Sequence, residues 1–240
     1  MTSLARYATI DPMAGDRRHW VATTGFVFVA LYLIGVALTT YHAIPSIDQP
    51  LPALSNFYAD SGNRIPVLIG GITLSASAPF LLAFVVAATV NPIAGREIEA
   101  ALARASAALF AACIVTGAIA LTLVAGELTF RTVAQPTADF ERWLAEFGYA
   151  LLLVPGMIAA ATVLVALARS HSVALPRAAA GTAYGVAGLS LAALPIAIAS
   201  GTLVWSQIPV SGWIVWLAAG ATRTTSALAS AEPGSANESA

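Results

Sequence analysis

Residues 105–128 read ASAALFAACIVTGAIALTLVAGEL, an apolar run whose only charged residue, Glu127, comes near its end. An α-helix needs about 20 consecutive apolar residues to cross the hydrocarbon core of a bilayer. Within lipid the backbone must satisfy its own hydrogen bonds, which favours a helix over an irregular segment. This stretch therefore predicts a membrane-spanning α-helix.

Five further apolar runs predict that the whole chain is an all-α polytopic bundle of about six spanning helices. The expected spans are 20–41, 65–90, 105–128, 147–167, 178–199 and 202–221. Trp20 and Tyr41 flank the first span as interfacial anchors. The last two spans require a tight turn near Ser200 and Gly201, so five helices with a re-entrant segment are the alternative.

The spans divide the chain into a membrane bundle and two tails. Residues 1–19 are expected to form a polar N-terminal tail, and residues 20–222 form the bundle. Residues 223–240 are rich in Ser, Ala and Glu, which predicts a disordered C-terminal tail.

Composition supports the membrane interpretation. Of the 240 residues, 58% are hydrophobic and only 10% are charged, whereas a soluble domain has about 25% charged residues. The net charge of −1 gives no basic field for nucleic acid, so no nucleic-acid partner is expected. The single cysteine, Cys113, excludes an intramolecular disulfide and a zinc site built on several cysteines.

The arginines predict the orientation of the bundle, because cytoplasmic segments carry an excess of basic residues. Arg64, Arg131 and Arg142 fall on one side of the expected topology. The remaining arginines fall on the other side: Arg6, Arg17, Arg18, Arg96, Arg104, Arg169, Arg177 and Arg223. Both termini are therefore expected in the cytoplasm, and the plasma membrane is the expected location.

The two longest loops lie on the outer side. Residues 42–64 contain Pro45, Pro50 and Pro52, which favours an extended, lid-like segment. Residues 129–146 contain Thr137 as a candidate N-cap, followed by acidic residues, which predicts a short helical segment leading into the fourth span.

The outer loops hold a candidate polar cluster. Its members are Tyr58, Asp60, Arg64, Glu127 and Arg131. Asp60 and Arg64 are four residues apart, as are Glu127 and Arg131, so each pair could form an ion pair. The plainer interpretations are the start of a helix at the membrane surface and ordinary helix-end pairs, and Arg142 with Glu146 repeats the spacing.

No catalytic, cofactor-binding or metal-binding residues are assigned from the sequence. Every Asp, Glu and Arg falls at or beyond the end of an expected span, which argues against a proton relay or an ion-coupled pump inside the membrane. His19, His42 and His171 lie at boundaries or in loops, so haem ligation by histidines within the helices is not expected.

Two further patterns concern helix shape and packing. Pro79 and Pro195 are candidate kinks in the second and fifth spans, at matched places in two inverted halves, a feature of transporter sites. Gly181, Gly185 and Gly188 are candidate helix-packing residues. They could serve a dimer face or internal packing.

The layout also resembles a group of bacterial six-helix membrane proteins of unknown function, common in high-GC genomes. Phe57-Tyr58-Ala59-Asp60 with Arg64 matches one recurrent pattern of the group, and Leu175-Pro176-Arg177 matches another. The group often has tryptophan after the second pattern, where this chain has Ala178. The resemblance covers about residues 20–223 and implies a six-helix bundle without an assigned activity.

Three functions are compatible with these patterns. The first is a non-enzymatic membrane component or accessory subunit that packs against other membrane proteins or a second copy. The alternative is a small permease for a neutral or apolar substrate. A less favoured hypothesis is a lipid-handling enzyme at the outer interface, which would use the acid–base groups Asp60, Glu127, Glu141 or His42.

Overall fold

The computed structural model describes residues 14–40, 42, 44–45, 50–90, 94–130, 138–170 and 177–200, and all regular structure within these ranges is α-helical. The described helices are α1 (Ala14–Thr39), α2 (Leu51–Ala59), α3 (Ser61–Thr89), α4 (Glu97–Phe130), α5 (Ala138–Ser170) and α6 (Arg177–Ser200). The expected span 202–221 and the tail 223–240 lie outside the described residues, as do residues 1–13 of the expected N-terminal tail.

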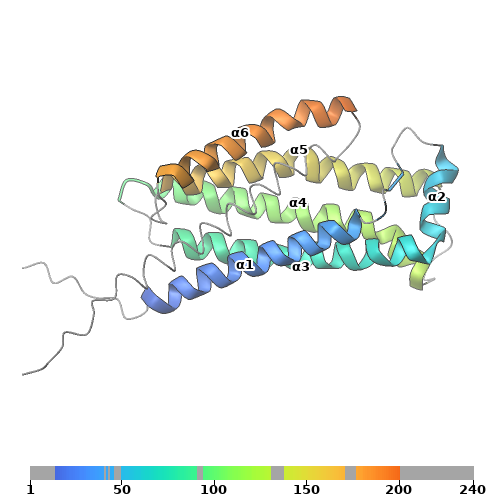
Figure 1. Cartoon of the computed structure of the whole chain (residues 1–240), viewed down its shortest axis with the longest axis horizontal. Helices are drawn as coiled ribbons and strands as arrows, with labels where there is room; N and C mark the ends of the chain where they lie inside the picture. Colours follow the sequence, from blue (N-terminus) through green and yellow to red (C-terminus); the bar gives the residue numbers. More distant parts are fainter. Residues whose placement is uncertain are drawn as a thin grey trace, which may run out of the picture.

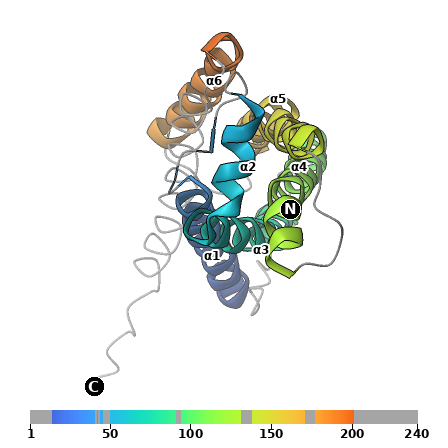
Figure 2. The same ribbon diagram turned by 90° about the vertical axis from the view of Figure 1, so that its right-hand side faces the viewer.

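Five long helices lie side by side, and the short α2 lies across one end of them (Figure 1). Along the bundle each long helix packs on the next in chain order, α1 on α3, α3 on α4, α4 on α5 and α5 on α6 (Figure 2). The main core runs through all five and is centred on large buried side chains such as Phe28, Leu81, Phe110, Ile114 and Leu164.

Large apolar side chains also lie on the outside of the bundle. Exposed side chains on α3 and α4 include Ile69, Ile72, Leu109, Ile119 and Leu123. Among the described residues, three helices, α3, α4 and α5, are long and apolar enough to cross a membrane. A helix that is hydrophobic on every side suits a lipid environment, so the all-α membrane fold expected from the sequence agrees with the structure at this level.

The helices extend beyond the apolar runs that predicted them. Helix α5 has 33 residues, which at 1.5 Å per residue is about 50 Å, against about 30 Å for the hydrocarbon core. Its polar first turns precede the expected span 147–167, and α4 likewise begins at Glu97 rather than near 105. Hydropathy marks the part of a helix that matches lipid, whereas charged residues can continue the same helix into water.

The extended, lid-like segment expected over residues 42–64 is wrong in part, because residues 51–59 form the helix α2. Pro50 is its N-cap with φ −56°, and Pro52 lies in the first turn. Proline suits the start of a helix, since the backbone N–H groups there have no partner within the helix. The prolines that suggested an extended chain therefore begin a helix instead.

Glycine brings α1 and α3 into backbone contact. A Cβ on Gly35 would lie 2.9 Å from the carbonyl oxygen of Gly70, and a Cβ on Gly70 would lie 2.9 Å from the carbonyl oxygen of Gly35. The same added atoms would lie 2.8 Å from the backbone nitrogens of Leu74 and Thr39, respectively. Only glycine fits at this crossing, as expected where membrane helices approach closely.

Glycine also lies at the crossings of α4 with α5 and of α3 with α4. A Cβ on Gly117 of α4 would lie 3.0 Å from the carbonyl oxygen of Gly148 on α5, and a Cβ on Gly148 would lie 2.9 Å from that of Gly117. Between α3 and α4, a Cβ on Gly71 would strike the side chain of Thr122. Close approach at glycine residues therefore occurs at each crossing between the long helices α1, α3, α4 and α5.

The glycines singled out in the sequence lie elsewhere. Gly181, Gly185 and Gly188 of α6 are exposed, and a Cβ added to any of them would meet no described atom within 4 Å. Helix α6 contacts α5 through the opposite side, which carries the buried residues Ala183 and Ala187. The packing role of the three glycines stays a prediction.

The two candidate kink residues lie within continuous helices, Pro79 in α3 and Pro195 in α6. Helix α3 packs between α1 and α4, whereas α6 packs on α5. The helices α4 and α5 therefore separate the two prolines, and these do not meet at a common interface.

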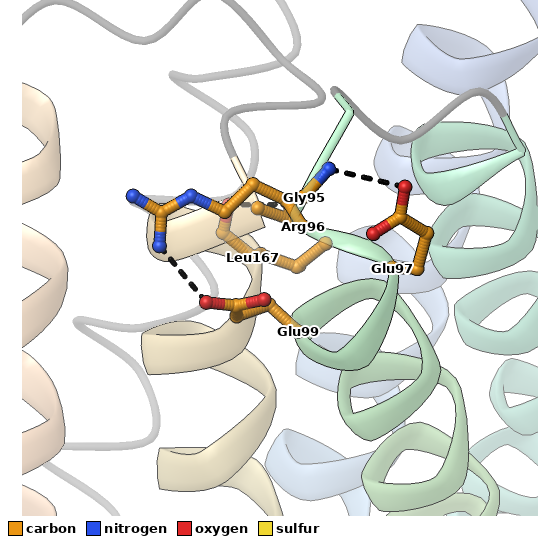
Figure 3. A network of polar contacts seen from close by, with 6 residues as sticks. Gly95, Arg96, Glu97, Glu99 and Leu167 are labelled. Carbon is orange, nitrogen blue, oxygen red and sulfur yellow. Dashed lines mark hydrogen bonds and ion pairs between the residues drawn. The ribbon is translucent and has the colours of Figure 1, made fainter.

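A turn at Gly95 precedes α4 at the end of the bundle opposite α2 (Figure 1), and Figure 3 shows its polar contacts. Gly95 has φ +83°, and its N–H donates to Glu97 Oε1 at 3.1 Å. Arg96 Nη1 pairs with Glu99 Oε1 at 2.9 Å. The turn lies beside Leu167, near the end of α5.

We expect Gly95→Ala to lower the free energy of unfolding by about 1 to 2 kcal/mol, because only the left-handed backbone, and no neighbouring atom, opposes a side chain there. Thermal unfolding in detergent micelles measures this loss. Gly95→Asn is the matched control and should lose less, because asparagine adopts this conformation more readily. Equal losses for both variants would contradict the backbone explanation.

Candidate functional site

The short helix α2 lies across the ends of the long helices (Figure 2) and forms its own small apolar cluster with residues of α3, α4 and α5. The cluster, here called the cap cluster, is separate from the main core of the bundle. Its buried members are Leu54, Phe57, Tyr58, Val67, Ala120, Val124, Ala125 and Leu144. Helix α2 is thus a cap whose attachment rests on one local set of contacts.

A sharp corner joins the cap to α3. Asp60 ends α2 and is the N-cap of α3, with its Oδ1 accepting from the N–H of Gly62 at 2.9 Å. Arg64 Nη1 donates to the carbonyl oxygens of Tyr58 at 3.1 Å and Ala59 at 3.4 Å. The aspartate thereby satisfies a donor at the start of one helix, and the arginine satisfies acceptors at the end of the other.

A carboxyl group is buried beneath the cap. Glu141, in the first turn of α5, is 4% exposed, and its Oε2 accepts from the hydroxyl of Ser55 on α2 at 3.3 Å. This contact joins residues far apart in the sequence. It places a group that can carry charge at the junction between the cap and the bundle.

Tyr58 is the largest side chain of the cap cluster and is 1% exposed. Its ring packs edge-on against Phe57, with ring centroids 5.2 Å apart. Among the described residues the Tyr58 hydroxyl has no hydrogen-bond partner. Burial raises the pKa of this hydroxyl far above its ordinary value, and the neighbouring Tyr149 and Glu141 raise it further.

Aromatic side chains mark the outside of the same end of the bundle. Phe140, Trp143 and Phe147 are exposed and stack along α5, with centroids 6.3 Å and 5.4 Å apart. Aromatic residues gather where a membrane protein meets the interface between lipid and water. Glu141 lies beside the first of them, in the turns of α5 that precede the expected span 147–167.

The structure brings together three members of the predicted polar cluster. Tyr58, Asp60 and Arg64 all lie at the corner between α2 and α3, where Tyr58 is buried and Asp60 is exposed. Glu127 falls in the last turn of α4 but its side chain lies outside the described residues, as does Arg131 altogether. Arg142 Nε pairs with Glu146 Oε1 at 3.0 Å, as its spacing predicts.

Sequence reasoning did not predict the burial of Glu141 or the role of Ser55. The sequence groups Glu141 with Asp60, Glu127 and His42 as acid–base groups at the outer interface, but Glu141 is buried whereas Asp60 and His42 are exposed. The sequence signal is helical spacing, which puts Glu141 on the same face of its helix as Leu144 and Gly148, and the structure buries all three. Nothing in the sequence around Ser55 indicates its contact with α5.

The chemistry of this arrangement is limited to a carboxyl, aliphatic and phenolic hydroxyls, and a guanidinium group that holds backbone carbonyls. Within the described ranges, no three His, Cys, Asp or Glu side chains gather closely enough to hold a metal ion. Comparison with protein families, with curated proteins and with solved structures found no match.

Proposed function

We propose that this chain is a multi-pass component of the plasma membrane, without an enzymatic role, that packs against another membrane protein through the outer face of α6. The proposal includes six spans, with residues 202–221 as the sixth, and both termini in the cytoplasm. The exposed glycine face of α6 is the single observation that carries the partner interaction.

The physical reason is the way membrane helices associate. Lipid offers no hydrophobic drive between helices, so close approach at small residues supplies the contact. The crossings at Gly35 with Gly70 and at Gly117 with Gly148 already use such residues inside the bundle. Helix α6 lies at the edge of the described bundle and carries Gly181, Gly185 and Gly188 on the side away from α5 (Figure 1).

The proposed orientation rests on the distribution of arginines. Arg96 and Arg169 lie at the end opposite the cap, whereas Arg64 and Arg142 lie at the cap end. The rule that basic residues favour the cytoplasmic side, applied to the whole sequence, puts the cap outside.

The permease and enzyme hypotheses have less support. The permease interpretation requires Pro79 and Pro195 to frame one site, and α4 and α5 lie between their helices. The enzyme interpretation requires interfacial acids that act together, but Glu141 is buried while Asp60 is exposed. No observation favours a substrate for either.

We expect Gly185→Leu to abolish the partner interaction while leaving the fold intact, because no described atom lies within 4 Å of the position. Mild extraction from the native membrane, followed by mass spectrometry, measures which proteins accompany the chain in fixed proportion. Ala76→Leu is the matched control, an exposed position on α3.

A stoichiometric membrane protein that is lost with Gly185→Leu and kept with Ala76→Leu would support the proposal. A homodimer lost in the same way would replace the partner with a second copy. A chain that purifies alone, or whose partner survives the α6 substitution, would contradict it.

A further inference from the structure

Glu141 is a buried carboxyl without a basic partner in the described part of the chain. Its Oε2 accepts a long hydrogen bond from the Ser55 hydroxyl, at 3.3 Å. The nearest arginine in sequence, Arg142, pairs with Glu146, and Arg64 donates to the carbonyls of Tyr58 and Ala59. A charged carboxylate in these surroundings would lose hydration without gaining an opposite charge.

Burial raises the pKa of the Glu141 carboxyl, and the hydrogen bond from Ser55 opposes part of that effect. The group lies in the first turn of α5, before the expected span and at the aromatic interface, so protons from the aqueous phase can reach this level of the molecule. Its protonation state is therefore coupled to whether the cap covers it.

We propose that Glu141 is a proton-binding site that controls the docking of α2, which packs on α5 when the carboxyl is neutral and separates from it when the carboxyl is ionised.

The cap is attached in a way that permits this change. Helix α2 is held to the bundle by the cap cluster, which is separate from the main core. The corner at Asp60 keeps it tethered to α3, where Arg64 is bonded to the end of α2. Separation would expose the cap cluster but would leave the crossings of the long helices untouched.

Other polar and titratable groups lie on the helices that pack around Glu141. On α2 these are Ser55 and Tyr58, and on α5 the phenol of Tyr149. On α3 the guanidinium of Arg64 donates to the carbonyl oxygens of Tyr58 and Ala59. On α4 the acid is Glu127, whose side chain lies outside the described residues, so the test must separate its contribution from that of Glu141.

The sign of the effect follows from linkage. A carboxyl whose pKa is raised by docking contributes stability that is fully present below its undocked pKa. That contribution is lost as the pH rises through the docked pKa. Acid therefore favours the docked cap, and alkali favours its release.

Cysteine labelling tests the proposal. In a Cys113→Ala background, Leu54→Cys places a thiol in the buried cap cluster, and Asn56→Cys places one on the exposed side of the same helix. The ratio of their maleimide labelling rates in lipid vesicles cancels the intrinsic pH dependence of thiol chemistry. We expect this ratio to rise about tenfold or more between about pH 5 and pH 9.

Glu141→Gln keeps the size of the side chain and removes its charge, so the ratio should stay low at every pH. Glu146→Gln, in the same helix and part of an exposed ion pair, should keep the parent dependence. A ratio independent of pH in the parent, or a pH dependence that survives Glu141→Gln, would overturn the proposal. A ratio that is high at every pH in Glu141→Gln would overturn it too, because a neutral group would then fail to dock the cap.

Discussion

Replacing Gly70 with alanine is expected to lower the free energy of unfolding by about 2 kcal/mol, within the range for overpacked positions. The added methyl group would lie 2.8 Å from the backbone nitrogen of Thr39 and 2.9 Å from the carbonyl oxygen of Gly35. Neither backbone atom can rotate away, so α1 and α3 must move apart. Thermal unfolding in detergent micelles measures the loss.

Gly188→Ala is the matched control for this prediction. It is the same substitution in a helix, at a place where no described atom lies within 4 Å of the new methyl group. Alanine is the better helix former by about 1 kcal/mol, so the control should be neutral or slightly stabilising. If the two variants changed the free energy of unfolding equally, the result would contradict the close backbone contact between α1 and α3 at Gly70.

Tyr58→Ala is expected to release the cap, because truncating a large buried aromatic residue costs about 3 to 5 kcal/mol. Tyr58 is the largest buried side chain of the cap cluster, and its loss leaves a void between α2 and α5. The labelling rate of Leu54→Cys should rise to that of Asn56→Cys. The unfolding of the bundle should change less, since the main core is separate.

Tyr58→Phe is the control that separates the ring from the hydroxyl. Because the hydroxyl has no hydrogen-bond partner among the described residues, its removal should leave the cap docked. A phenylalanine variant that releases the cap as fully as the alanine variant would show that the hydroxyl, and not the packing of the ring, holds α2 in place.

The sequence predicted the helices better than it predicted their contacts. The apolar runs at 105–128 and 147–167 fall within α4 and α5, and the run at 65–90 matches α3 except for Val90; these three are the described helices that are long and apolar enough to cross a membrane. Length and hydropathy suffice for this, since lipid imposes one requirement on any spanning segment. The predicted extended segment was wrong over α2, because proline suits both a helix start and an extended chain.

The sequence did not predict which residues lie at the contacts between helices. Gly181, Gly185 and Gly188 showed the expected spacing, yet the glycines at helix crossings are Gly35, Gly70, Gly71, Gly117 and Gly148. In a chain rich in small apolar residues, many helix faces carry glycine or alanine at the spacing that suits close helix packing. Which of them meet depends on the order and angle of the helices, which no local pattern encodes.

The sequence by itself determined that this protein is helical and that three of its described helices, α3, α4 and α5, are apolar and long enough to cross a membrane, because partitioning between water and lipid is a property of each segment alone. Only the tertiary structure decided that α2 caps the bundle and that Ser55 meets Glu141 beneath it. A carboxyl that is interfacial by sequence is buried once another helix lies over it, since burial depends on contacts between residues far apart in the chain.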